Sequence, residues 1–206
     1  MTLDQLRPRI SGLLDPWVRA ANALGMTPDG VSVVAFALAL AAGGLYAYAG
    51  PAVGDVTVLY AAGAVCVFFN GWLDVVDGEL AREQDVASEG GDLLDHVLDR
   101  YADVAIIAGL AAGIGRYDLG LAAVTGVLLT SYLGTQAQAV GLDRVYAGVL
   151  GRADRLALAG AVGLAVVLYP SELLGLTLVG WLLVAFAVVG HVTALQRFWG
   201  AWTRLD

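Results

Sequence analysis

The sequence predicts an all-α integral membrane protein, in which six transmembrane helices are preceded by an N-terminal amphipathic helix in the membrane interface. Three observations predict this fold. Of the 206 residues, 59% are hydrophobic and only 15% are charged, whereas soluble domains carry about 25% charged residues. The apolar residues gather in runs of about 20, long enough to cross roughly 30 Å of hydrocarbon as a helix. Almost all arginines lie on one side of these runs, which is typical of a membrane protein with a fixed orientation.

Residues 1–25 are predicted to form the interfacial helix. Its apolar stripe, with three- and four-residue spacing, consists of Leu3, Leu6, Ile10, Leu13, Trp17, Ala21 and Leu24. The arginines of this segment lie off the stripe. Asp15-Pro16 is a candidate helix start, and Gly25 is a candidate end. The alternative is a soluble helix that packs against the rest of the protein.

Six apolar runs follow and are predicted to span the membrane. They cover residues 31–49, 56–73, 101–115, 118–140, 156–170 and 173–195. The third run is short, but it becomes long enough if its helix begins near Gly91 and projects beyond the bilayer. The many glycines in the spans allow the helices to approach closely. We expect one domain over 1–206, with the interfacial helix at 1–25 and the transmembrane core at 30–198.

The arginines predict the orientation of these spans. Only Arg116 falls on one side. The other ten are Arg7, Arg9, Arg19, Arg82, Arg100, Arg144, Arg152, Arg155, Arg197 and Arg204. Because cytoplasmic loops are enriched in basic residues, both termini are expected in the cytoplasm. The chain is thus expected to be a multi-pass protein of the cell membrane.

The charge composition argues against nucleic acid as a partner. The net charge is −8, and all 11 basic residues are arginine. Such a surface repels phosphate backbones. An acidic, lysine-free composition is typical of a high-salt cytoplasm and indicates a halophilic archaeon with ether-linked lipids. The lone cysteine, Cys66, excludes an intrachain disulfide and a Cys-rich metal site.

The segment 74–99 carries the candidate catalytic and metal-binding residues. Within it, Asp74, Asp77, Gly78, Ala81 and Arg82 are spaced to share one face of a helix. A second set, Gly91, Asp95 and Asp99, also shares one helical face. Residues 83–90 can turn the chain, so two helices of opposite direction would bring four carboxylates together.

Four facing carboxylates repel one another unless cations lie between them. Oxygen ligands suit Mg²⁺, Mn²⁺ or Ca²⁺, whereas zinc prefers nitrogen and sulfur. Two such ions about 3.5–4 Å apart are a known arrangement for displacement at phosphorus. The two glycines leave the helix surface open to a nucleotide, and the planar guanidinium of Arg82 suits a phosphate. A solvated acidic loop would explain the other acidic residues of the segment, but not this helical register.

The segment matches D-x2-D-G-x2-A-R-x8-G-x3-D-x3-D at every specified position and therefore resembles the CDP-alcohol phosphotransferases. The resemblance extends to the six spans and the interfacial helix, so it covers nearly the whole chain. It implies that Asp74, Asp77, Asp95 and Asp99 hold two ions, Mg²⁺ or Mn²⁺. It also implies that Asp99 is the general base that deprotonates the acceptor hydroxyl, and that the protein is a homodimer.

The resemblance further implies a site for the CDP moiety of a CDP-lipid. Its expected residues are Asp29, Ser32, Gly78, Arg82, Ser88 and Gly91. The first two belong to the sequence Pro28-Asp29-Gly30-Val31-Ser32, where the family often has Pro-Asn-x-x-Thr. The substitutions of Asn by Asp and of Thr by Ser depart from that pattern.

The acceptor is indicated by arginines outside the motif. Arg152 and Arg155 open the fifth span, and Arg197 follows the sixth. These positions resemble the family members that use inositol phosphate, and arginines bind phosphate in a bidentate manner. Setting topology or reaching for lipid headgroups is the alternative role. The subgroup usually carries basic residues after Ser131-Tyr132, and here there are none, so glycerol phosphate, serine and inositol stay open as acceptors.

Three further residues have more than one interpretation. His96 is expected at the surface or behind the metal ligands, because it lies on a different helical face from Asp95. His191 lies inside the last span, where a histidine is often functional but where one hydrogen bond would also explain it. Asp103 extends the aspartate stripe by a turn, and it either supports the site or stabilises the fold through Arg100 or Tyr101.

Two other functions also fit intramembrane aspartates. A cation transporter would place its carboxylates near the middle of the bilayer on interrupted helices, whereas here they cluster at the ends of spans together with an arginine. A structural membrane protein would not need the helical register. The helical register therefore favours a membrane enzyme. The resemblance implies that this enzyme transfers a phosphatidyl-type group from a CDP-lipid to the hydroxyl of a phosphorylated polyol and releases CMP, with an unphosphorylated alcohol as the alternative acceptor.

Overall fold

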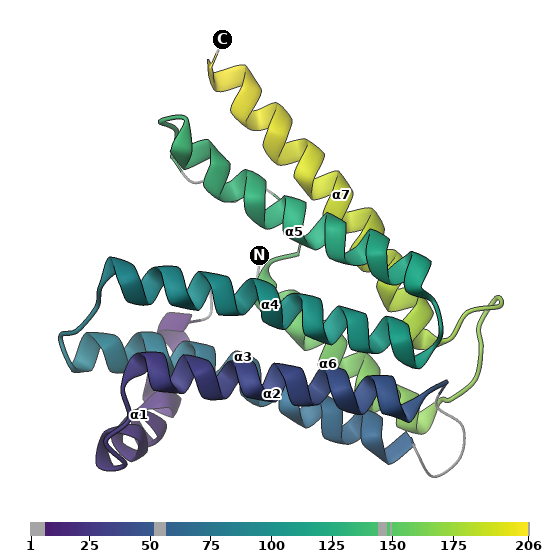
Figure 1. Cartoon of the computed structure of the whole chain (residues 1–206), viewed down its shortest axis with the longest axis horizontal. Coiled ribbons are helices and arrows are strands. Elements are labelled where there is room, and N and C mark those ends of the chain that lie inside the picture. Colours follow the sequence, from purple (N-terminus) through teal and green to yellow (C-terminus); the bar gives the residue numbers. More distant parts are fainter. Residues whose placement is uncertain (1–6, 52–56, 144–147, 149, 206) are drawn as a thin grey trace.

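A computed structural model describes residues 7–51, 57–143, 148 and 150–205, and all secondary structure elements within these ranges are helices, apart from one isolated bridge. The seven helices are α1 (Arg7–Ala23), α2 (Pro28–Ala49), α3 (Thr57–Glu83), α4 (Glu89–Gly113), α5 (Tyr117–Ala139), α6 (Arg152–Leu168) and α7 (Leu178–Leu205). Helices α2, α3 and α4 lie side by side, and α5 and α7 form a pair that runs at an angle to them (Figure 1). Helix α6 packs on α3 and also contacts α7.

Glycines bring the helices into backbone contact, as the sequence predicts. A Cβ added at Gly109 of α4 would lie 2.2 Å from the carbonyl oxygen of Gly43 in α2. A Cβ added at Gly190 of α7 would lie 2.7 Å from the carbonyl carbon of Gly126 in α5. Both distances are too short for any side chain, so the two helix pairs pack this closely only because glycine is present.

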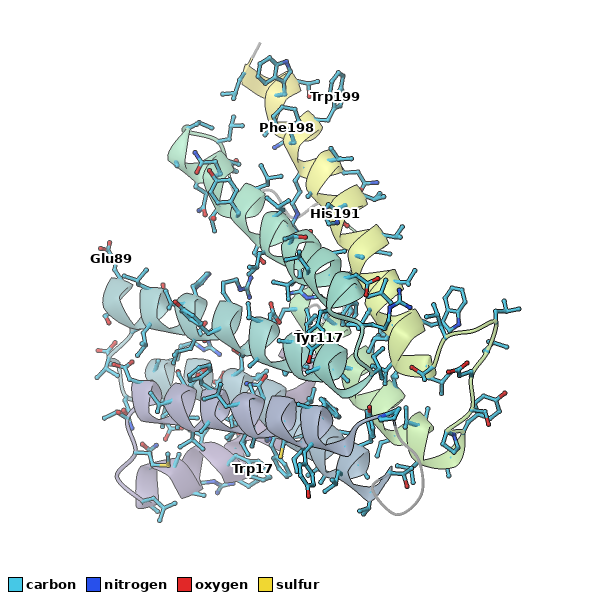
Figure 2. All side chains as sticks on the ribbon, turned by 45° about the vertical axis from the view of Figure 1, so that its right-hand side comes forward. Trp17, Glu89, Tyr117, His191, Phe198 and Trp199 are labelled. Carbon is cyan, nitrogen blue, oxygen red and sulfur yellow. The ribbon has the colours of Figure 1, made fainter. Side chains whose placement is uncertain are left out.

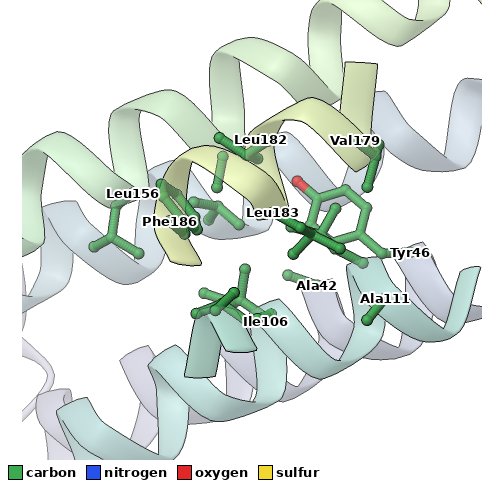
Figure 3. Close-up of a cluster of buried hydrophobic side chains, with 14 of the residues drawn as sticks. Ala42, Tyr46, Ile106, Ala111, Leu156, Val179, Leu182, Leu183 and Phe186 are labelled. Atoms are coloured by element: carbon green, nitrogen blue, oxygen red, sulfur yellow. The ribbon is translucent and has the colours of Figure 1, made fainter. Parts of the chain in front are cut away.

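The apolar core lies where α2, α3, α4, α6 and α7 meet. Figure 3 shows Tyr46, Ile106, Leu183 and Phe186 within this cluster, and all four are buried. The polar residues of the 74–99 segment lie beyond one end of the core. The core thus fixes the relative positions of the helices that carry them.

In the described part of the chain, four helices are long and apolar enough to cross a membrane, namely α2, α3, α5 and α7. By the length and composition of these helices, the chain is a multi-pass membrane protein. Helix α4 falls outside this group because its first half carries the acidic residues, and α6 has only 17 residues. Helix α4 begins at Glu89, close to Gly91, where the sequence predicts that the third span begins.

The N-terminal helix differs from the prediction at its start. Pro16 lies inside α1, so Asp15-Pro16 is wrong as the helix start. A proline inside a helix removes one backbone hydrogen bond and clashes with the carbonyl four residues earlier, so the packing of the neighbouring residues Leu14 and Val18 must offset this cost. The predicted apolar stripe is also divided, because Leu13 and Leu24 are 63% and 76% exposed. Leu3, Leu6, the Ile10 side chain and Arg144 lie outside the part of the chain that the structure describes.

The buried face of α1 packs against α3. It consists of Leu14, Val18 and Ala21, which contact Val31, Val76 and Leu80. Trp17 contacts Phe69 and Trp72 of α3 at centroid distances of 6.0 and 6.2 Å (Figure 2 labels Trp17). Asn22 donates a hydrogen bond of 2.8 Å to Glu83. Helix α1 therefore holds the end of α3 that carries the motif, while other apolar residues of α1 stay exposed.

The last helix begins later and ends later than the predicted span 173–195. Residues 173–177 form a short turn, in which Gly175 has a positive φ of 78°. The Thr177 hydroxyl accepts a hydrogen bond of 3.1 Å from the backbone N–H of Gly180 and caps the helix. The predicted start at residue 173 is therefore wrong. Helix α7 continues to Leu205, and its exposed Phe198 and Trp199 lie near its C-terminal end (Figure 2).

Candidate metal and nucleotide site

The turn between α3 and α4 brings the two halves of the motif together. Helix α3 ends at Glu83 and α4 begins at Glu89, as the spacing predicts. The Ser88 hydroxyl caps α4 by accepting a hydrogen bond of 3.1 Å from the N–H of Gly91. Asp85 takes a positive φ of 54° in the turn. The two helices then run in opposite directions, with their aspartates facing each other.

All four predicted metal ligands line one pocket. Asp74, Asp95 and Asp99 each place a carboxylate oxygen within 4.8 Å of the others. Asp77 lies in the same pocket, is only 6% exposed, and accepts a hydrogen bond of 2.5 Å from the Ser32 hydroxyl. Clustered, half-buried carboxylates without soft ligands suit a hard divalent cation such as Mg²⁺ or Mn²⁺. The residues present therefore fit the ions that the sequence predicts.

The electrostatics of this pocket disfavour bare negative charge. Asp95 precedes the apolar part of α4, and burial together with the neighbouring Asp74 raises its pKa. The guanidinium of Arg152 opposes this rise in the pKa of Asp95. A cation between the carboxylates would remove the repulsion that remains.

Arg152 lies among these carboxylates. Its Nη1 is 2.7 Å from Oδ1 of Asp74, and its Nη2 is 2.7 Å from Oδ1 of Asp99. Nη2 also donates to the Asn70 side-chain oxygen at 3.5 Å. The sequence predicts Arg152 as a ligand of the acceptor's phosphate, and the structure brings it to the metal ligands as well.

The predicted CDP residues lie around the same ends of α2, α3 and α4. Ser32 lines the pocket, and a Cβ added at Gly91 would lie 3.5 Å from Oδ1 of Asp29. At Gly78 an added Cβ would meet only the end of the Arg82 side chain, at 3.9 Å. Arg82 is exposed and forms an ion pair of 2.5 Å with Glu79. The surface at Gly78 is thus open, as nucleotide contact with the backbone requires.

The other two predicted acceptor residues have protein partners. Arg155 is buried, and its Nη2 is 2.8 Å from Oδ2 of Asp103. Arg197 donates a hydrogen bond of 2.7 Å to the backbone carbonyl of Thr130. Asp103 also lies 3.6 Å from Arg100, one of the two partners that the sequence leaves open, and Arg155 adds a partner that the sequence does not predict.

Sequence reasoning misses Asn70 and the contacts of Arg100 near the site. Asn70 is buried, donates to the carbonyl of Ala35 at 2.9 Å and lines the pocket. The sequence feature that could have identified Asn70 is a polar amide within an apolar run, four residues before Asp74. Arg100 lies 3.4 Å from Asp99 and donates to the Ser131 hydroxyl. This contact brings a positive charge to the end of α5, where the sequence has none.

Both histidines are exposed. The His96 ring lies 4.0 Å from Asp95 and 2.7 Å from the carbonyl of Asp92. His191 lies on α7 (Figure 2), and its Nδ1 is 2.9 Å from the carbonyl of Ala187. His96 is thus at the surface, beside the aspartate cluster, and does not line the pocket.

Comparisons with known proteins agree with this geometry. Residues 20–199 match the model of the CDP-alcohol phosphatidyltransferase family. The chain is 30% identical to archaetidylinositol phosphate synthase of Methanothermobacter thermautotrophicus, over 98% of this chain and 95% of that protein. It is 30% identical to phosphatidylinositol phosphate synthase of Mycobacterium marinum, over 96% of this chain and 82% of that protein.

Solved structures of the Mycobacterium tuberculosis phosphatidylinositol phosphate synthase share the fold. The structure with CDP-DAG bound matches with a TM-score of 0.77 and 25% identity, over 94% of this chain and 95% of that chain. The structure in complex with manganese and citrate also matches with a TM-score of 0.77 and 25% identity, over 92% and 89% of the two chains.

Proposed function

Because the chain belongs to the CDP-alcohol phosphatidyltransferase family, we propose that it makes a phospholipid headgroup by transferring a phosphatidyl-type group from a CDP-lipid to the hydroxyl of a phosphorylated polyol, with release of CMP. Inositol phosphate is the acceptor that the names of its relatives support, and glycerol phosphate is the second. The observation that carries the proposal is the pocket in which Asp74, Asp77, Asp95 and Asp99 meet Ser32 and Arg152.

The four aspartates would hold two divalent ions, Mg²⁺ or Mn²⁺. When bound, these ions supply positive charge to the pyrophosphate and to the leaving CMP. Ser32 fixes Asp77 through its 2.5 Å hydrogen bond, so this carboxylate keeps its orientation. Asp99 takes the proton of the acceptor hydroxyl, since a carboxylate at hydrogen-bond distance acts as a general base.

The CDP moiety would lie along the open face of α3 and across the start of α4. Gly78 and Gly91 let it approach the backbone, and Arg82 is exposed and close enough to Gly78 to bind a phosphate. Asp29 and Ser88 border Gly91 and complete this subsite.

A phosphorylated acceptor is favoured by the arginines beside the aspartates. Arg152, Arg155 and Arg197 are the proposed phosphate site, and Arg100 adds a charge next to Ser131. The alternative acceptor is an uncharged alcohol such as serine or inositol. It is favoured by one observation, namely that Arg155 is paired with Asp103 inside the protein.

The proposed membrane arrangement extends the four spans to six. Helices α4 and α6 cross the bilayer beside them, and the start of α4 projects beyond the bilayer together with the site. Helix α1 lies in the interface with Leu13 and Leu24 exposed. The protein lies in the cell membrane, and its site faces the cytoplasm. The whole chain forms one domain. The acidic composition supports ether-linked lipids of a halophilic archaeon as substrates, and family membership supports a homodimer.

The proposal is tested by CMP release from a CDP-lipid by the purified protein. We expect release that requires Mg²⁺ or Mn²⁺, stops with excess chelator, and is faster with inositol phosphate than with inositol or serine. Asp74→Asn should abolish release while the protein stays folded, and Asp118→Asn, at the opposite end of the helices, should leave it unchanged. Wild-type release in excess chelator, or with Asp74→Asn, would exclude this function.

A further inference from the structure

Arg152 is placed differently from every other arginine near the site. Its two terminal nitrogens bridge Asp74 and Asp99, with distances of 2.7 Å to one oxygen of each. The side chain is 13% exposed. Its Nε is buried without a hydrogen-bond partner among the described residues, a feature that it shares with Arg100 and Arg155. Arg152 is the first residue of α6, so its side chain extends from a helix end into the pocket.

This bridge uses carboxylate oxygens that a metal site needs. Asp74 and Asp99 are two of the three aspartates whose oxygens converge within 4.8 Å. The guanidinium takes one oxygen of each of these two carboxylates. A divalent ion on the same carboxylates would lie close to the guanidinium, and like charges that are close together repel strongly in a half-buried site. Arg152 and a divalent ion therefore compete for Asp74 and Asp99.

We propose that Arg152 competes with a divalent ion for Asp74 and Asp99, and that the released guanidinium is the one that captures the acceptor's phosphate. This inference rests on the proposed function, because it assumes that these aspartates hold the ions and that the acceptor is phosphorylated. Arg152 then couples the binding of the ion to the binding of the acceptor's phosphate. Loading of the site with metal makes the acceptor's phosphate site available.

The neighbouring arginines cannot perform this exchange. Arg155 is paired with Asp103 and does not line the pocket. Arg197 contacts a backbone carbonyl of α5. Arg100 reaches Asp99 only at 3.4 Å and is shared with Asp103 and Ser131. Only Arg152, among the described arginines, contacts two of the proposed ligands at ion-pair distance.

Thermodynamic linkage turns the competition into a measurable coupling. If phosphate draws the guanidinium away, the carboxylates become available to the metal ion. The acceptor's phosphate must then increase the affinity for the metal ion by the same factor by which the metal ion increases the affinity for the phosphate. If the bridged arrangement makes up about 90–99% of the molecules, the apparent metal affinity is weakened by about 10- to 100-fold. Removal of the bridge should restore that affinity.

The test measures Mn²⁺ binding directly, by electron paramagnetic resonance of free Mn²⁺, with the intact protein in lipid nanodiscs. Binding is measured with and without inositol 1-phosphate, and with inositol as the matched ligand that lacks the phosphate. For the wild type we expect Mn²⁺ to bind about 10-fold more tightly with inositol 1-phosphate, and no change with inositol. This comparison needs no variant and so does not depend on how a variant folds.

Two variants separate the bridge from general charge. Arg152→Gln should bind Mn²⁺ about 10-fold more tightly than the wild type and should lose the effect of inositol 1-phosphate. Arg100→Gln removes an equal charge beside Asp99 without removing the bridge, so its Mn²⁺ affinity should rise by less than about threefold and the coupling should persist.

The outcomes distinguish this inference from the function on which it rests. Equal tightening by Arg152→Gln and Arg100→Gln would show a general charge effect and overturn the competition. If Mn²⁺ binding to the wild type depends on Asp74 but does not change with inositol 1-phosphate, the competition is also overturned, whereas the metal site remains supported. If Mn²⁺ binding does not depend on Asp74, the proposed function itself is contradicted, because that function requires Asp74 to hold the ions.

Discussion

Replacing Asp103 with asparagine tests whether the buried Asp103–Arg155 ion pair holds α4 and α6 together. The two side chains are 4% and 8% exposed, and their atoms lie 2.8 Å apart. The neutral amide would leave the Arg155 guanidinium buried without its counter-charge. Removing one partner of a buried pair costs about 3–5 kcal/mol, and for a chain of this size each kcal/mol lowers Tm by about 2–4 °C. We therefore expect Asp103→Asn to lower Tm by about 6–20 °C.

The matched control is the Arg116–Asp118 pair, whose distance of 2.7 Å is similar but whose side chains are 41% and 64% exposed. Solvent screens an exposed ion pair, so its contribution to stability is small, and Asp118→Asn should shift Tm far less than Asp103→Asn does. The assay is thermal unfolding in one detergent, followed by intrinsic fluorescence, for both variants and the wild type. If Asp103→Asn and Asp118→Asn shift Tm equally, burial does not strengthen the Asp103–Arg155 pair and the reasoning fails. A normal Tm with a raised KM for inositol phosphate would instead assign Arg155 to the acceptor.

Three further variants test the site and the packing. Asp99→Asn should lower kcat by about 100- to 10,000-fold, the usual loss for a general base, with CDP-lipid binding retained; loss of binding as complete as in Asp74→Asn would make Asp99 chiefly a metal ligand. Ser32→Ala removes the donor to buried Asp77 and should weaken Mn²⁺ binding by about 5- to 100-fold; unchanged binding would show that this hydroxyl does not orient Asp77. Gly109→Leu should prevent folding, because even a Cβ at this position would lie 2.2 Å from a backbone oxygen of α2. Gly44→Leu is the control and should fold normally, because no atom lies within 4 Å of a Cβ added there. Size-exclusion profiles measure both outcomes.

Local patterns predict the site's framework because helical register is a local property. The spacing of Asp74, Asp77, Asp95 and Asp99 places them on two faces, and the turn at 84–88 brings the faces together. The close approach of α2 and α4 likewise follows from the glycines of the spans. These features depend on residues that are near in sequence or on the absence of a side chain.

The partners of the arginines are not predictable in this way. Arg155 meets Asp103 across 52 positions of sequence, and Arg152 meets Asn70 across 82. These contacts depend on where α6 packs against α3 and α4, and no periodicity in α6 encodes that position. The start of α7 is missed for a different reason. The residues before Leu178 are as apolar as a helix, and only the Thr177 cap and the turn at Gly175 end the helix there.

The arginines also adjust the charge of the site to its proposed substrate. Five carboxylates, namely the four motif aspartates and Asp103, are linked with three guanidinium groups, those of Arg100, Arg152 and Arg155, so the cluster carries a formal charge of −2. Two divalent ions would change this to +2, which is complementary to a pyrophosphate with two negative charges. Without the arginines, the same ions would leave the cluster negative and repel the pyrophosphate. Because of the arginines, the site becomes positive when two ions bind, and it then attracts the negatively charged substrate.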